Sequence, residues 1–129
     1  DVSKDMINNN LSALRRTKKM PHIRARGIQQ TVLEKVAVDI VEQFAKLTDT
    51  PNDHFTVEHI ASQFVAAGGA SSGYPFIEVL WFDRGQDSKT AVANLIDEAL
   101  RPFVGKHTDI TVLFEDLNGK DYYENREHF

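Results

Sequence analysis

The chain contains no cysteine among its 129 residues. This absence excludes disulfides, thiol nucleophiles and cysteine metal sites, and it fits a reducing compartment, so we expect a cytoplasmic protein. Long apolar runs are also missing, because no stretch approaches the roughly 18 apolar residues that a membrane-spanning helix needs. We therefore expect a soluble protein with no membrane partner.

Signals for cofactors and nucleic acids are lacking as well. His54 and His59 are five positions apart and the other histidines are scattered, so no metal site is expected. Glycine-rich phosphate loops are absent, and no cofactor is expected. Residues 1–20 carry five basic and two acidic side chains, so residues 21–129 are more acidic than the net charge of −4 indicates. An acidic body argues against a nucleic-acid partner, because Lys and Arg supply most of the affinity for phosphates.

Residues 1–20 differ in pattern from the rest of the chain and are treated as an N-terminal extension. Two interpretations stay open: the segment forms one amphipathic helix, or it is not native, since the chain begins with Asp rather than Met. The basic run at 15–19 is interpreted as solvated charge rather than as an arm for an acidic partner. Residues 21–129 have the length of one domain.

Two strand-helix-strand units follow one another in that domain. In the first unit, alternation over 21–26 and 55–60 predicts two strands, and three- and four-residue spacing over 31–47 predicts the helix between them. Turn-forming residues at 48–53 separate the helix from the second strand. This helix has the most regular apolar pattern in the chain.

The second unit repeats the first. An apolar run at 76–82 predicts a strand covered on both faces, and 110–117 predicts the last main strand. The helix between them is predicted to be capped by Asp87 or Ser88 and to end or bend at Pro102.

Duplication of the unit predicts an α+β fold with a four-stranded mixed sheet and two helices on one face, because parallel units have right-handed crossovers. The small residues at 67–73 predict a flexible connection between the units. One layer of helices leaves the other face of the sheet open, so we expect a homo-oligomer that forms through the sheet.

The C-terminal tail is predicted to turn back on the domain. Asn118 and Gly119 form a strong hairpin-turn signal, because both residues tolerate positive φ. The tail after them contains the aromatic residues Tyr122, Tyr123 and Phe129. We expect it to pack on a pocket or on a neighbouring subunit.

Several stretches carry a resemblance to a known family. With its doubled unit, the chain resembles the tautomerase superfamily, specifically its two-repeat members similar to macrophage migration inhibitory factor. A closer resemblance is to a small uncharacterised bacterial family within that superfamily. The stretches concerned are Met20-Pro21, Gly68–Ser72 before Pro75, Asp116–Asn118, Trp81–Gly85 and Tyr122–Asn125.

This resemblance implies that Pro21 is a catalytic amino-terminal proline and that the protein forms trimers with sites between subunits. A proline nitrogen is a basic secondary amine only at a free amino terminus, where the reference pKa is about 7.7–8.0 and burial or a nearby cation lowers it. Such an amine moves a proton beside a carbonyl, which is keto-enol tautomerisation, or attacks the carbonyl. The alternative is a strand-opening proline whose nitrogen is locked in an amide.

Substrate-binding residues are implied in the same way. Arg84 would hold a carboxylate or enolate of a small keto acid, or would be an exposed turn residue. Leu117, Tyr123 and Phe129 would form apolar pocket walls or cover an interface. His22 adjoins the proline and would either tune it or face solvent.

Charged residues on the strands limit the substrate class. Arg24 and Arg26 would attract acidic substrates or pair with Glu58 of the neighbouring strand. Glu58 stands where the 4-oxalocrotonate tautomerases have a substrate-binding arginine, which argues against dicarboxylates. Three hypotheses remain: a keto-enol tautomerase, a non-catalytic oligomeric module with Pro21 blocked, and a ferredoxin-like domain that binds ligands between protomers.

Overall fold

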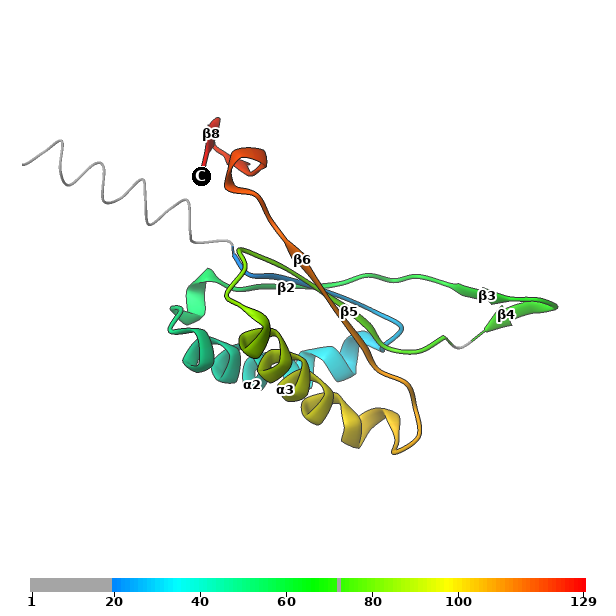
Figure 1. The fold of residues 1–129 in the computed structure, drawn as a ribbon. Coiled ribbons are helices and arrows are strands. Elements are labelled where there is room, and N and C mark those ends of the chain that lie inside the picture. The colour runs from blue at the N-terminus through cyan, green and yellow to red at the C-terminus, as the bar shows by residue number, and fades with distance from the viewer. Residues whose placement is uncertain (1–19, 72) are drawn as a thin grey trace, which may run out of the picture.

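The computed structural model describes residues 20–71 and 73–129, so the predicted extension up to residue 19 lies outside the described residues. The body is a four-stranded sheet with two helices packed on one face (Figure 1). Its elements are β1 (His22–Arg26), α2 (Gln30–Thr48), β2 (Thr56–His59), β5 (Phe76–Trp81), α3 (Gln86–Val104) and β6 (Thr111–Asp116).

The sheet has the strand order β2-β1-β5-β6. Strands β1 and β2 are parallel, as are β5 and β6, while the two central strands β1 and β5 are antiparallel. The predicted α+β fold, with a mixed sheet and both helices on one face, is therefore confirmed. The antiparallel centre brings the start of β1 beside the end of β5, where His22 pairs with Leu80.

Alternation along the strands decides which side chains form the core. Alternate residues of β1 and β5 are buried and meet the apolar stripes of α2 and α3, as the spacing predicted. The core residues are Ile23, Ala25, Leu33, Val36, Ile40, Phe44, Ile77, Val79, Trp81, Val92, Leu95, Ile96 and Leu100.

The ends of α3 differ from the prediction. Gly85, and not Asp87 or Ser88, is the N-cap residue, with φ at 93°, and its N–H donates to Asp83 Oδ1 at 2.9 Å. A positive φ is open to glycine, so the helix begins before the expected caps. Pro102 lies inside the helix, which ends two residues later at Val104, because proline removes only its own N–H near the last turn.

The small residues between the units form a hairpin rather than a plain flexible connection. Strands β3 (Phe64–Ala66) and β4 (Gly69–Ser71) pair in antiparallel fashion and project beyond the sheet (Figure 1). Gly68 and Gly69 have positive φ and make the reversal possible. Residue 72, which belongs to the predicted connection at 67–73, lies outside the described residues.

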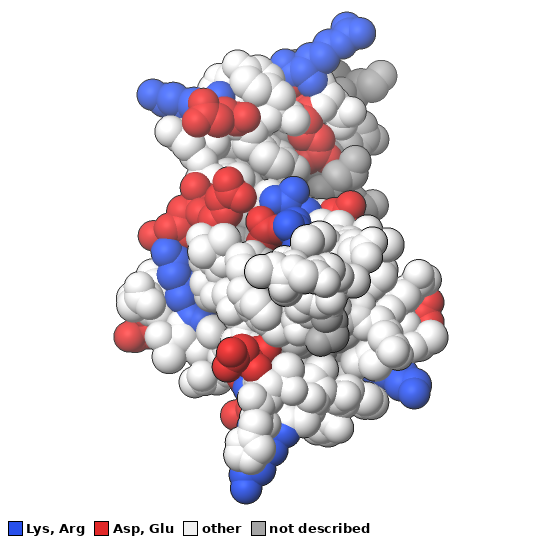
Figure 2. All heavy atoms as spheres, turned by 90° about the vertical axis from the view of Figure 1, so that its right-hand side faces the viewer, with Lys and Arg blue, Asp and Glu red and all other residues white. Residues whose placement is uncertain are grey.

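Seen from the hairpin side, the molecule carries acidic and basic side chains interspersed over its surface (Figure 2).

The tail turns back, but its hairpin turn is not at the predicted place. Asn118 has φ at −88° and caps the 3-10 helix η2 (Gly119–Asp121), its side-chain oxygen accepting from the Lys120 N–H at 3.0 Å. The positive φ values fall instead on Asn125 and Arg126, between β7 (Tyr123–Glu124) and β8 (Glu127–His128). Asn118 fails as a turn residue because its side chain is committed to the cap.

The sheet face away from the helices carries a charged network. Glu78 of β5 accepts from Arg24 at 3.2 Å and from Arg26 at 2.8 Å, while Glu58 contacts His22 Nε2 at 2.9 Å. The expected pairing of both arginines with Glu58 is therefore wrong, since the antiparallel neighbour β5 supplies the nearer carboxylate.

Within residues 20–71 and 73–129, no helix has the length and apolar character needed to cross a membrane.

Candidate functional site

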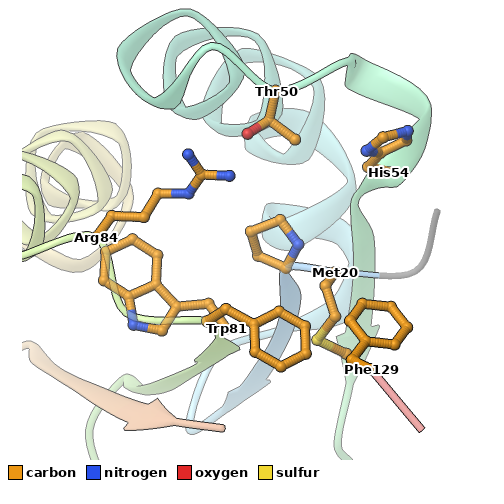
Figure 3. Close-up of a pocket in the computed structure, with 8 residues that line it drawn as sticks. Met20, Thr50, His54, Trp81, Arg84 and Phe129 are labelled. Carbon is orange, nitrogen blue, oxygen red and sulfur yellow. The ribbon is translucent and has the colours of Figure 1, made fainter. Parts of the chain in front are cut away.

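A small open pocket lies where β1 begins and β5 ends. Its volume is about 70 Å³, and Phe129 of the returning tail is one of the residues around it (Figure 3). Four segments contribute to it: the start of β1, the turn after α2, the loop after β5 and the C-terminal residue. The lining residues are Met20, Pro21, Thr50, His54, Trp81, Phe82, Arg84 and Phe129.

Pro21 is buried at the amino end of β1. Its carbonyl oxygen accepts a hydrogen bond from the Thr56 N–H at 3.2 Å, which fixes the backbone against the start of β2. Its nitrogen forms a peptide bond with Met20 in this chain. An amide nitrogen has no available lone pair, so Pro21 can act as a base only when no residue precedes it.

Arg84 supplies the positive charge of the pocket. It lies in the loop between β5 and α3, and its Nη1 donates to the carbonyl oxygen of Thr48 at 3.0 Å. Within the described part of the chain no carboxylate pairs with it, whereas Arg24, Arg26 and Arg101 each pair with one. The guanidinium has five N–H donors, so Arg84 retains donors for an anion in the pocket.

Aromatic rings form the other walls. Phe129 stacks on Phe82 with ring centroids 5.0 Å apart, and Tyr122 meets both rings edge-on at 4.8 and 5.6 Å. Burial, and secondly the charge of Glu124, raises the pKa of the Tyr122 phenol. The backbone N–H of Phe129 donates to Gly119 and Tyr122, which anchors the tail against the pocket.

The buried indole of Trp81 is tied to a carboxylate beside the pocket. Its Nε1 donates to Asp116 Oδ1 at 2.8 Å, and Lys89 Nζ donates to Asp116 Oδ2 at 2.7 Å. The ammonium of Lys89, and then the indole N–H, lower the pKa of Asp116. The same carboxylate raises the pKa of Lys89.

Three of the residues expected at the site meet in the pocket: Pro21, Arg84 and Phe129. His22 lies on the opposite face of the sheet from the core, with Nδ1 hydrogen-bonded to Thr56 and Nε2 to Glu58. His22 is therefore not among the residues that line the pocket, and its expected binding role stays a prediction.

The other two expected wall residues also lie outside this pocket. Leu117 donates its backbone N–H to the Trp81 carbonyl at 2.7 Å and is half-buried. Tyr123 is 64% exposed and meets His128 edge-on. A role for either residue in binding stays a prediction and would require a surface beyond this single chain.

The sequence did not indicate Thr50, His54, Trp81 or Phe82 as pocket residues. Thr50 and His54 lie in or beside the 3-10 turn η1 (Asn52–His54), where the composition indicated only a turn. For Trp81 and Phe82, the apolar run at 76–82 predicts only a buried strand. Trp81 and Phe82 would be expected at the pocket only if the antiparallel pairing of β1 with β5 were known, because this pairing puts the end of β5 beside Pro21.

The described residues that line the pocket do not include a cluster of metal-ligating side chains. No group of three or more His, Asp or Glu side chains in the described ranges is placed to hold a metal ion. The polar groups of the pocket are instead one guanidinium, one imidazole and one hydroxyl, from Arg84, His54 and Thr50. Such a set suits a small organic anion.

The doubled unit and its sheet order define a tautomerase-superfamily fold. A macrophage migration inhibitory factor-like protein from Entamoeba histolytica has a TM-score of 0.67 at 14% identity, covering 85% of this chain and 99% of that chain. A fused 4-OT described as an asymmetric trimer has a TM-score of 0.64 at 12% identity, covering 84% and 95%. At these identities the likeness shows the fold alone.

The chain belongs to the family described as a domain of unknown function, DUF1904, whose model matches residues 20–128. A crystal structure of a DUF1904 domain from Sebaldella termitidis ATCC 33386 is 32% identical, with a TM-score of 0.79, covering 85% of this chain and 100% of that chain. None of the curated proteins matches this chain. The resemblance to an uncharacterised family is thereby confirmed, and so is the tautomerase-like fold that the other resemblance implies.

Proposed function

We propose that this protein is a keto-enol tautomerase of a small keto acid, with Pro21 as amino-terminal base and Arg84 as the anion-binding group. The observation that carries the proposal is the meeting of these two residues in one pocket. The tautomerase-superfamily fold supports it, because it brings the start of β1 to a pocket at the end of β5.

The chemistry requires only one proton to change place. A neutral Pro21 amine removes a proton from the carbon beside the carbonyl; the C–H electron pair becomes the C=C bond, and the carbonyl electrons move to oxygen. The guanidinium of Arg84 stabilises the negative charge of the enolate or of the substrate carboxylate. Return of the proton to oxygen gives the enol, and the reverse sequence gives the keto form.

The walls of the pocket favour a small monocarboxylate. Arg84 is the one Lys or Arg among the lining residues, which matches a single carboxylate. Phe82 and Phe129 offer apolar surface for a flat or aliphatic substituent, next to the buried ring of Trp81. The volume of about 70 Å³ is below the roughly 300–1,000 Å³ of ordinary ligand sites, so a second copy of the chain would complete the enclosure.

The decisive experiment compares two forms of the protein. One form begins at Pro21, as verified by intact mass, and the other retains Met20 and the residues before it. Conversion of enol phenylpyruvate to the keto form is expected to be fast only in the first form, because only there is the nitrogen an amine. Equal rates in both forms would overturn the role of Pro21.

A matched variant separates the base from the pocket. Pro21→Ala in the form that begins at residue 21 keeps a free amino terminus but replaces the secondary amine with a primary one and removes the ring contacts. We expect a lower kcat with little change in the affinity for phenylacetate, a monocarboxylate ligand, since Arg84 is still present to bind its carboxylate. Retention of full kcat would show that the pyrrolidine nitrogen is not required.

A second candidate function is a binding module without catalysis. It is favoured by the peptide bond between Met20 and Pro21, which leaves a formed pocket without a proline amine. In that case both forms of the protein bind phenylacetate alike and neither converts phenylpyruvate. The pocket at Pro21 argues against the ferredoxin-like hypothesis, and a trimer in solution would argue against it further.

We further propose that the protein is a homotrimer built through the open face of its sheet. The helices cover one face, whereas Leu113 on the other is 48% exposed. The Nε atoms of Arg24 and Arg26 are buried there without a partner in the described chain, which a neighbouring copy would provide. Size-exclusion chromatography with light scattering is expected to give a trimer mass, and a clean monomer would refute it.

A further inference from the structure

Asp116 joins three elements at the back of the pocket. Its Oδ1 accepts from the indole Nε1 of Trp81 on β5, and its Oδ2 accepts from Nζ of Lys89 on α3, at 2.8 and 2.7 Å. Trp81 and Asp116 are also direct neighbours in the parallel pairing of β5 with β6. Each carboxylate oxygen therefore has one donor, and the two donors come from different elements.

The indole depends on this carboxylate for its orientation. Trp81 is 1% exposed and packs against Phe44 and Phe114, with ring centroids 6.0 and 5.0 Å away. These apolar neighbours offer no acceptor, and an unpaired buried N–H is unfavourable. The hydrogen bond to Asp116 therefore selects the orientation of the Trp81 ring in which Nε1 reaches the carboxylate.

Lys89 extends the same chain of contacts to the loop that carries Arg84. Its Nζ lies 3.7 Å from Asp83 Oδ1, the oxygen that also accepts the Gly85 N–H at 2.9 Å. Arg84 lies between these two residues. One ammonium therefore ties the pocket wall at Trp81 and the loop of Arg84 to the first turn of α3.

We propose that the Lys89–Asp116 pair is the positioning element of the pocket: it holds the Trp81 ring as a wall and holds the Arg84 loop in place. Neither residue lines the pocket, so both act through other side chains. The inference rests on the proposed function only for its ligand measurement. The positioning itself has a direct reporter, since Trp81 is the single tryptophan of the chain.

The test compares substitutions at Asp116 with a matched ion pair elsewhere on α3. Asp97 and Arg101 are also 2.7 Å apart and partly exposed, but neither residue lines the pocket. The variants are Asp116→Ala, which removes both acceptors, Asp116→Asn, which keeps an oxygen for the indole, and Asp97→Asn as the control. Thermal unfolding of each verifies that it is folded at the assay temperature.

Trp81 fluorescence decides the positioning role. In Asp116→Ala we expect a shift of the emission maximum and stronger quenching by acrylamide; Asp116→Asn should recover most of the wild-type signal, and Asp97→Asn should match wild type. If Asp116→Ala unfolds, Lys89→Met is measured instead. A smaller shift of the emission maximum is expected there, because Asp116 keeps the indole N–H but loses the ammonium. A wild-type spectrum and quenching in the folded variant would overturn the proposal.

Calorimetry with phenylacetate then connects the position to binding. We expect affinity to fall by about tenfold in Asp116→Ala, because a side-chain displacement near 1 Å already impairs a site. Unchanged affinity beside altered fluorescence would also overturn the proposal, since the pair would then orient an indole that the ligand does not use. Absence of phenylacetate binding to the wild type would refute the proposed ligand class, while the fluorescence comparison still decides the positioning of Trp81.

Discussion

The guanidinium of Arg84 donates from Nη1 to the carbonyl oxygen of Thr48 at 3.0 Å. This bond joins the loop after β5, in the second unit, to the last residue of α2, in the first. Carbonyls in the last turn of a helix have no partner within the helix, and a cation there is favoured by the helix dipole. Arg84 therefore stabilises the end of α2 while its remaining donors are available to a ligand.

Replacement of Arg84 is expected to affect binding and stability together. Arg84→Met should lower phenylacetate affinity by about tenfold or more, through loss of a charge-assisted contact, and the free energy of unfolding by about 1 kcal/mol. Arg84→Lys keeps the positive charge but not the planar, forked set of N–H donors, and should bind phenylacetate with intermediate affinity. Calorimetry and urea unfolding measure the two effects.

Arg101 provides the control for this prediction. It donates to the carbonyl of Gly105 just after α3, as Arg84 does to that of Thr48, but it does not line the pocket. Arg101→Met should therefore lower stability and leave phenylacetate affinity unchanged. The anion-binding role of Arg84 is contradicted if Arg84→Met also binds phenylacetate as the wild type does.

The fold could be predicted because its elements have strong periodicity. Regular spacing along α2 marks a helix whose stripe of Leu33, Val36 and Ile40 is buried. The limits of prediction lie at the turns. Asn118 is a turn residue by composition, yet its side chain caps η2 and the positive φ values fall on Asn125 and Arg126 instead.

The site was only partly accessible from sequence. Pro21 and Arg84 were identified through a family resemblance, since neither periodicity nor spacing distinguishes a base or an anion site. Trp81 was indistinguishable from any core residue, because alternation shows that a side chain is buried but not which edge of its ring reaches a cavity. His54 became a pocket residue only through the conformation of a turn, which depends on tertiary packing.

The environment of Trp81 is expected to change with acid at an unusually low pH. The ammonium of Lys89, and then the Trp81 indole, lower the pKa of Asp116 in the folded protein. The stability that this carboxylate contributes is therefore complete above the ordinary aspartate pKa of about 3.9 and is lost as the pH falls through the lower folded value. The fluorescence transition of Trp81 should lie in that acid range.

Lys89→Met tests the cause of this shift. Without the ammonium, Asp116 should titrate closer to the ordinary aspartate value, so the fluorescence transition should move to higher pH. Far-UV circular dichroism at the same pH values distinguishes a local change from general unfolding. Identical midpoints in the two proteins would show that Lys89 does not set the pKa of Asp116.

Packing of the tail can be followed through the phenol of Tyr122. Burial raises its pKa, and the ring of Phe129, 4.8 Å away, contributes to that burial. Phe129→Ala should admit water and lower the pKa of Tyr122 toward the ordinary value of about 10. The measurement is a titration of tyrosinate absorbance.

Tyr123→Phe assigns the titrating group. Tyr123 is 64% exposed, so its replacement should leave the raised component, that of Tyr122, in place. Phe129→Ala should shift only the raised component. If that component is unaffected by Phe129→Ala, the tail does not bury Tyr122 in solution.

Gly27 is the position where the fold tolerates a side chain least. It follows β1 with φ at 73°, and a Cβ there would overlap the backbone carbonyl oxygen of Tyr74. Gly68 also has a positive φ, at 102°, but a Cβ there meets nothing within 4 Å. Gly68→Ala should thus cost about 1–2 kcal/mol, from the backbone conformation alone. Gly27→Ala should lower the free energy of unfolding by about 3 kcal/mol or more, since two backbone segments must separate. Equal losses in urea unfolding of the two variants would mean that the segments of Gly27 and Tyr74 are not in close contact in solution.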